Sequence, residues 1–75
     1  MNITVKCFAS LSRHTPQDAE AFPVAPGERV AEVVARLGIA PEELKLIFVN
    51  GIHAELSRQL AEGDRLGLFP AVGGG

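Results

Sequence analysis

The chain has 75 residues, of which 47% are hydrophobic and 21% are charged, and its formal net charge is −2 at pH 7. This length suits one domain, and so short a chain buries only about 60% of its unfolded surface. The negative charge argues against nucleic acid as a partner, since nucleic-acid-binding proteins normally present a basic face. The single cysteine excludes an internal disulfide framework. Without a signal peptide or an apolar run of about 18 residues, we expect a cytoplasmic protein that does not engage a membrane.

The first predicted strand covers residues 2–8, where apolar and polar residues alternate with the period of a half-buried strand. The apolar set is Ile3, Val5 and Cys7, and the opposite set is Thr4, Lys6 and Phe8. Because Cys7 belongs to the apolar set, we interpret it as a small buried hydrophobic residue and not as a reactive thiol.

The next part of the chain is predicted as turns and a short edge strand. Residues 9–20 are polar, lack periodicity and contain a turn cluster at 15–18. Residues 21–24 form a second strand, and Pro23 places it at an edge or a strand end because proline has no N–H to donate. A turn at Pro26-Gly27 follows.

A helix is predicted over residues 30–37, because Val30, Val33, Val34 and Leu37 recur at i, i+3, i+4 and i+7. Gly38 supplies its C-terminal stop. The residue before Val30 is an arginine, which is not an N-capping residue. Residues 40–44 are predicted as one further helical turn, with proline at its first position.

Three strands are predicted in the second half of the chain. Residues 45–49 and 52–54 flank Asn50-Gly51, the sequence most typical of a tight hairpin. Residues 55–61 are a connector anchored by Leu56 and Leu60. A turn at 62–64 leads into the last strand, where Leu66 and Leu68 point one way, Phe69 points the other way and Pro70 ends the pairing.

The order strand, strand, helix, strand, short strand, strand indicates an α+β fold of the β-grasp, or ubiquitin-like, type. One main helix packs across one face of a mixed sheet of four to five strands, with the first and last strands adjacent at the centre. The other face stays open, and its candidate lining residues are Thr4, Lys6, Phe8, Val49 and Phe69. An exposed pair of phenylalanines would mark a partner surface. The alternative is that Phe8 packs into the polar loop and no patch exists.

No set of side chains in the sequence predicts catalysis or metal binding within the chain. His14 and His53 have no ligand partners at usable spacing, so surface positions are expected for both. The pairs Glu42-Glu43 and Glu62/Asp64 are most simply a helical first turn and a turn. Gly73–Gly75 is not a phosphate loop, because no helix follows it.

The last residues differ from the rest of the chain in chemistry. We divide the chain into a β-grasp domain at 1–70 and a glycine tail at 71–75. Glycine has no Cβ, so a tail ending in three glycines is thin and conformationally free, and its carboxylate can enter a narrow channel. Residues 71–75 span roughly 17 Å when fully extended. The simpler alternative is a frayed terminus.

An ordered set of motifs runs through the second half of the chain: Val49-Asn50-Gly51, then Gly63-Asp64-Arg65-Leu66, then Leu68-Phe69-Pro70-Ala71-Val72-Gly73-Gly74-Gly75. This set, with Phe8-Ala9 and Val30 to Val34, resembles the small sulfur-carrier family of β-grasp proteins. That family includes the small subunit of molybdopterin synthase (MoaD) and the thiamine-pathway sulfur carrier (ThiS). The likeness covers nearly the whole chain.

The resemblance implies that the carboxylate of Gly75 is the working group. An E1-like adenylyltransferase of the MoeB/ThiF type would adenylate it with ATP, and a persulfide donor would convert it to a thiocarboxylate. The carrier itself would be no enzyme and would bind neither metal nor cofactor. Its partners would be the activating enzyme and the large subunit of molybdopterin synthase, or a thiazole synthase. The residues implied in partner binding are Phe8, Phe69, Pro70, Ala71, Val72, Gly73 and Gly74.

Two departures bear on which branch of the family the chain resembles. Ala71 and Gly73 stand where the pterin-branch tail more often has proline and alanine, and a Val-Gly-Gly-Gly ending is also seen in the thiazole branch. The polar segment 9–20 and Phe69-Pro70 favour the pterin branch, which we prefer. Two other classes stay open, namely a ubiquitin-like modifier joined to lysines through Gly75 and a binding module with an inert tail.

Overall fold

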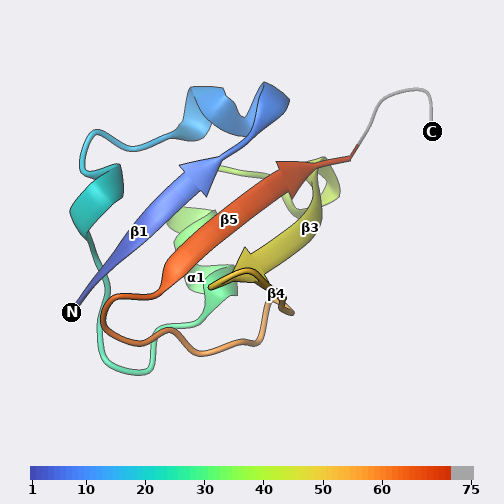
Figure 1. The fold of residues 1–75 in the computed structure, drawn as a ribbon. Coiled ribbons are helices and arrows are strands. Elements are labelled where there is room, and N and C mark those ends of the chain that lie inside the picture. The colour runs from blue at the N-terminus through green and yellow to red at the C-terminus, as the bar shows by residue number, and fades with distance from the viewer. Residues whose placement is uncertain (72–75) are drawn as a thin grey trace.

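The computed structural model describes residues 1–71, which form a five-stranded mixed sheet with one α-helix lying across one of its faces (Figure 1). The strands are β1 (Asn2–Cys7), β2 (Phe22–Pro23), β3 (Leu44–Val49), β4 (Ile52–His53) and β5 (Arg65–Pro70). The helix is α1 (Val30–Arg36), and the 3-10 turns are η1 (Ala9–His14), η2 (Ala19–Ala21) and η3 (Pro41–Glu43). None of the helices within residues 1–71 has the length and apolar composition needed to cross a bilayer.

The first and last strands of the described chain lie side by side at the centre of the sheet. The strand order is β2-β1-β5-β3-β4, and β1 pairs with β5 in parallel while the other neighbours are antiparallel. Val5 pairs with Leu66 and Cys7 pairs with Leu68, which places both strands' apolar residues toward the helix. The predicted β-grasp fold, its central strand pair and its edge strand at Pro23 are therefore confirmed.

The hydrophobic core lies between the sheet and α1. Its most deeply buried side chains are Ile3, Leu11, Val30, Val33, Val49, Leu66 and Leu68. Burying each such side chain contributes about 1.5–3 kcal/mol, so this layer supplies most of the stability of a domain without disulfides. Cys7 packs against the core, but it is half-buried and not fully buried as the sequence predicted.

The two ends of α1 are satisfied in different ways. Gly38 adopts a left-handed φ of 78° directly after the last turn, as predicted for the stop. At the other end none of the described residues supplies an N-cap side chain, and the N–H groups of Val30 and Ala31 donate to the carbonyls of Arg58 and Leu56, both at 2.9 Å. The side chain of Glu32 accepts the backbone N–H of Arg29, also at 2.9 Å. The contact of Glu32 is one half of a capping box. The carbonyls of the connector supply the acceptors that an N-cap side chain would otherwise provide, so the helix can begin after an arginine.

The Asn50-Gly51 turn is fastened to the start of β5. Both turn residues have positive φ values, 56° and 81°, as the favoured two-residue hairpin requires. The Asn50 amide donates to Asp64 Oδ1 at 2.9 Å, and its oxygen accepts the N–H of Arg65 at 2.9 Å. Asp64 Oδ2 in turn accepts the N–H of Ala61 at 2.8 Å. One network thus joins the two turns and sets the register of β3 against β5.

A buried carboxylate holds the segment between β2 and α1. Glu28 is only 8% exposed, and its oxygens accept the N–H of Ala25 and a guanidinium N–H of Arg36, both at 2.8 Å. The hydrogen bond from Ala25, followed by the charge of Arg36, lowers the pKa of Glu28 despite its burial. Arg36 also stacks over the ring of Phe22 at 4.5 Å. Both oxygens of the Glu28 carboxylate are therefore hydrogen-bonded, and one of them is paired with a positive charge, as a buried carboxylate requires.

Several sequence-based predictions are wrong in detail. Val49 was expected on the open face but is fully buried, because Val49 pairs with the inward-facing Leu66. Leu56 was expected to anchor the connector, yet it is 38% exposed and Leu60 alone of the pair is buried. The prediction for Pro70 is confirmed, since Pro70 is the last residue of β5 and pairs with Leu44.

The polar segment 9–20 is also more ordered than its composition indicated. It contains η1 and η2, and Leu11 on η1 is 1% exposed within the core. A single leucine among polar residues forms no periodic apolar pattern, so the sequence pattern did not indicate that Leu11 is buried and predicted only turns.

Candidate functional site

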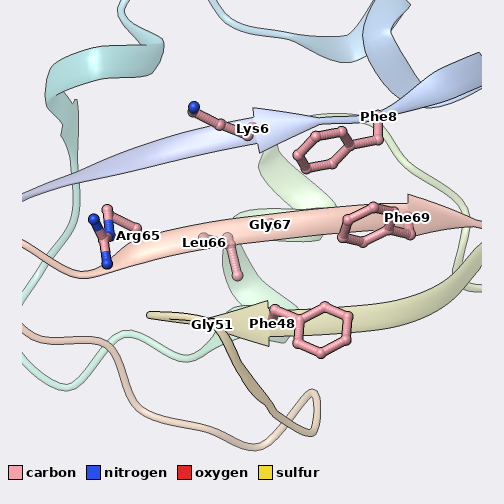
Figure 2. Close-up of a pocket in the computed structure, with 8 residues that line it drawn as sticks. All are labelled: Lys6, Phe8, Phe48, Gly51, Arg65, Leu66, Gly67 and Phe69. Carbon is pink, nitrogen blue, oxygen red and sulfur yellow. The ribbon is translucent and has the colours of Figure 1, made fainter.

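The open face of the sheet carries three phenylalanines that lie side by side on three neighbouring segments (Figure 2). The rings of Phe8 and Phe69 stack with centroids 4.2 Å apart and an angle of 3° between planes. Phe48 meets Phe69 edge-to-face at 5.6 Å. We call these three residues the phenylalanine cluster. Both arrangements are favourable aromatic geometries, so the rings hold one another in place.

The position of Phe8 is set by the backbone around it. Its N–H donates to the carbonyl of Leu68 at 3.0 Å, which extends the β1–β5 pairing by one residue. Ala9 then takes a positive φ of 52°, so the chain turns sharply into η1 and leaves the ring of Phe8 beside Phe69. The alternative in which Phe8 packs into the polar loop is therefore excluded.

Gly67 provides the floor of a hollow beside the cluster. A Cβ at this position would lie 3.6 Å from Phe8 Cε2 and 3.7 Å from Phe69 Cε1, so glycine leaves the rings with open space next to them. The hollow has a volume of about 370 Å³. Figure 2 shows the phenylalanines at one end and the cationic side chains of Lys6 and Arg65 toward the other.

The hollow combines an apolar wall with uncompensated positive charge. Within residues 1–71, neither Lys6 nor Arg65 takes part in an ion pair. Phe8 is 38% exposed, and Leu46, which pairs with Phe69 on β3, is 40% exposed. Contiguous exposed apolar groups on a small protein are typical of a surface that binds another protein.

Phe48 was missed by the sequence analysis, which assigned Val49 to this face. Phe48 is identified by the register of β3 against β5, which decides the face of the sheet on which each residue lies. Phe48 pairs with Gly67 and Val49 pairs with Leu66, so only Phe48 can share a face with Phe69. A bulge between Leu44 and Leu46 shifts the register of β3 against β5. Alternation counted from the start of this strand in the sequence therefore does not show which residues face the open side.

The chain leaves the sheet next to the phenylalanine cluster. Phe69 is followed by Pro70, which still pairs with Leu44, and by Ala71, whose N–H donates to the carbonyl of Glu43 at 3.0 Å. The predicted tail residues Val72, Gly73, Gly74 and Gly75 lie outside the described residues. Their roles, like those of Phe8, Phe69, Pro70 and Ala71 in partner binding, stay predictions.

The other titratable candidates do not assemble into a catalytic or metal site. Among the described residues, no group of three His, Cys, Asp or Glu side chains could hold a metal ion. His53 lies exposed at the edge of Phe48, whereas His14, expected at the surface, is half-buried between η1 and α1. Burial raises the pKa of the Cys7 thiol, and a hydrogen bond with Thr15 opposes that rise. A thiol of this kind stays protonated and is a poor nucleophile near neutral pH.

The sequence profile of the ThiS family matches residues 5–75, nearly the entire chain. The chain belongs to the ThiS family. It is accordingly a ThiS/MoaD-type sulfur carrier or ubiquitin-like protein, from a family of small carrier proteins. Comparison with curated proteins found no match.

Two solved structures share the fold over almost their whole length. SAMP1 from Haloferax volcanii has a TM-score of 0.71 and 25% sequence identity, with 100% of both chains covered. A Pyrococcus furiosus protein assigned as subunit 1 of a molybdopterin converting factor has a TM-score of 0.74 and 24% identity. The similarity covers 96% of this ThiS-family chain and 99% of that one. At 24% identity, the second likeness establishes the fold alone.

Proposed function

We propose that this ThiS-family protein carries sulfur on the carboxylate of Gly75 and supplies it to molybdopterin biosynthesis. The observation that supports this most directly is the phenylalanine cluster at the point where β5 leaves the sheet. A partner that docks on the cluster receives the tail at the same place. The four residues after Ala71 reach at most about 14 Å beyond the domain when extended, so docking fixes where the carboxylate can go.

The chemistry resides at the terminal carboxylate and in the partner enzymes. In the activating enzyme, a carboxylate oxygen of Gly75 attacks the α-phosphorus of ATP and pyrophosphate leaves, which gives an acyl-adenylate. The outer sulfur of a persulfide attacks the acyl carbon and AMP leaves. A thiol then reduces the resulting acyl disulfide, releasing the thiocarboxylate and forming a disulfide on the donor side. The carrier binds neither ATP nor sulfur donor in the absence of these partners.

The carrier contributes docking and positioning and not catalytic groups. The half-buried Cys7 has a raised pKa, and the described residues hold no cluster of metal ligands. Positioning alone has large effects, because holding a reactant in productive geometry replaces a bimolecular encounter by an effectively unimolecular one. The proposed partners are an E1-like adenylyltransferase and a synthase large subunit that accepts the tail.

We prefer a pterin acceptor to a thiazole acceptor for two reasons. The polar segment 9–20 and Phe69-Pro70 are the sequence features that favour the pterin branch. The Pyrococcus furiosus structure of the same fold is also assigned as a subunit of a molybdopterin converting factor. Transfer of sulfur to thiazole, or joining of Gly75 to lysine amines of other proteins, would use the same activated carboxylate.

The test is intact-mass spectrometry after incubation with ATP, an E1-like enzyme and a persulfide donor. We expect the mass gain for replacement of one oxygen by sulfur, localised to the C-terminal peptide and absent from a variant that lacks Gly75. The charged carrier is then mixed with a molybdopterin synthase large subunit and pterin precursor, or with a thiazole synthase. Loss of the added sulfur only in the first mixture supports the pterin acceptor. Loss only in the second would refute it, and adducts of Gly75 on lysine would identify a modifier.

A further inference from the structure

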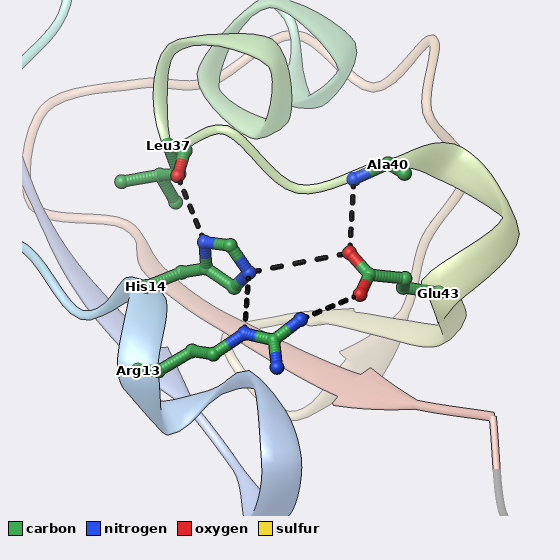
Figure 3. Close-up of polar contacts among 5 residues, drawn as sticks. All are labelled: Arg13, His14, Leu37, Ala40 and Glu43. Atoms are coloured by element: carbon green, nitrogen blue, oxygen red, sulfur yellow. Dashed lines mark hydrogen bonds and ion pairs between the residues drawn. The ribbon is translucent and has the colours of Figure 1, made fainter.

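A cluster of polar side chains connects η1, η3 and the C-terminal end of α1 (Figure 3). Glu43, the last residue of η3, accepts a hydrogen bond from Arg13 Nη2 at 2.8 Å through Oε2. Its Oε1 accepts the backbone N–H of Ala40 at 3.3 Å and lies 4.0 Å from His14 Nε2. One carboxylate thereby connects η1 with the first turn of η3.

His14 ties the same cluster to the end of α1. Its Nδ1 lies 3.2 Å from the carbonyl oxygen of Leu37, and its Nε2 lies 3.3 Å from Arg13 Nε. A ring that donates from Nδ1 to the carbonyl and accepts at Nε2 from the guanidinium satisfies both contacts. The imidazole thus fills the space between η1 and the C-terminal end of the helix, and it holds Arg13 against Glu43.

The backbone of Glu43 is the part that reaches the tail. Its carbonyl accepts the N–H of Ala71, at 3.0 Å, beyond the last residue of β5. The four residues that carry the proposed chemistry follow Ala71 directly. Because the side chain links Glu43 to η1 and its carbonyl accepts the N–H of Ala71, the position of η3 is coupled to that of Ala71.

We propose that Arg13, His14 and Glu43 form a clamp that positions the exit of the tail for activation, with Glu43 as the principal positioning residue. This inference rests on the proposed function at Gly75. It gives a role in that function to residues outside the phenylalanine cluster. Arg13 and Glu43 have partly exposed side chains, 66% and 37%, so their ion pair alone contributes little to global stability. The ion pair instead has a local effect: it increases the fraction of molecules in which Ala71 is held in the orientation that the partner accepts.

The test compares Glu43→Ala with Glu42→Ala, which removes the neighbouring exposed glutamate of the same 3-10 turn and serves as the matched control. Hydrogen exchange of the Ala71 amide, read by NMR, reports the anchoring directly. We expect Glu43→Ala to accelerate this exchange about two- to fivefold and Glu42→Ala to leave it unchanged. The amides of Val5 and Leu66 at the sheet centre should exchange as in the wild type, which verifies that the variant is folded.

The same variants are then assayed as substrates of the activating enzyme. Because the apparent KM scales inversely with the fraction of molecules in which Ala71 is held, it should rise in Glu43→Ala by at most the factor by which the opening equilibrium of Ala71 increases, while kcat is unchanged. Glu43→Gln keeps an acceptor for Ala40 and Arg13, so it should restore most of the wild-type KM. Equal Ala71 exchange and equal KM in Glu43→Ala and Glu42→Ala would overturn the clamp. If the wild type is never activated, the proposed function fails, while the Ala71 exchange rates still decide whether the clamp holds the exit.

Discussion

The docking role of the phenylalanine cluster predicts that Phe8→Ala separates binding from folding. Phe8 is 38% exposed and contacts the fold mainly through its stack on Phe69, with centroids 4.2 Å apart. Such a pair contributes about 0.5–1.5 kcal/mol beyond area burial. We therefore expect Phe8→Ala to lower the free energy of unfolding by about 1–2 kcal/mol, less than the 3–5 kcal/mol typical of a buried phenylalanine.

The expected effect on partner binding is larger. An aromatic residue at the centre of an interface costs at least about 2 kcal/mol when truncated, which corresponds to an approximately 30-fold increase in Kd. Truncation also removes one wall of the hollow above Gly67, so the partner loses both contact area and shape complementarity. The assay is calorimetric titration of the carrier into the activating enzyme, with urea unfolding of the same variants.

Leu56→Ala is the matched control for this experiment. Leu56 has the same exposed fraction, 38%, but lies in the connector between β4 and β5, where its carbonyl accepts the N–H of Ala31 in α1. The Leu56→Ala variant should bind the activating enzyme with a Kd within about twofold of the wild-type value, as expected of an energetically near-neutral position. If Phe8→Ala weakens binding no more than Leu56→Ala does, the open face is not the docking surface and the reasoning is refuted.

Three further predictions concern the scaffold that positions this site. Asn50→Ala removes two hydrogen bonds of the turn network and leaves the buried Asp64 without one partner. It should therefore lower the free energy of unfolding, measured in urea, by about 2–3 kcal/mol. A decrease below about 0.5 kcal/mol would show that the network does not set the register. The folded-state pKa of Glu28 is lowered from 4.5, so the stability that its ionised form contributes with Arg36 is present above that pH and is lost as the pH falls through the folded value. Unfolding midpoints of Glu28→Gln should therefore vary less between about pH 5 and pH 2 than those of the wild type, and parallel pH profiles would contradict this assignment. Cys7, whose pKa is raised by burial, should react with iodoacetamide at neutral pH at least about tenfold more slowly in the folded protein than in urea, and equal rates would show an accessible thiol.

Most of the fold follows from local patterns in the sequence. Asn50-Gly51 specified the hairpin because few residue pairs accept two positive φ values in succession. The valines of α1 specified the covered face of the sheet through their spacing, and Gly38 specified the end of the helix. These features could be predicted because each depends only on residues within one turn or one repeat of the apolar pattern.

The composition of the site was less accessible from the sequence. Phe48 and Val49 are adjacent and both apolar, so only the register against Gly67 and Leu66 decides which of them faces the open side. That register is fixed by the contacts of Asn50 with Asp64 and is interrupted by a bulge in β3, both of them tertiary features. The same holds for the clamp, whose residues lie about 30 positions apart in the sequence and show no local motif.

The central claim is that sulfur is carried on the carboxylate of Gly75. The most direct measurement is fragmentation mass spectrometry of the C-terminal peptide, after the purified protein has reacted with ATP, its activating enzyme and a persulfide donor. The account predicts that one oxygen of the terminal glycine is replaced by sulfur and that alkylation of the product adds one label at that residue. An unmodified Gly75 with sulfur bound at Cys7 would contradict it.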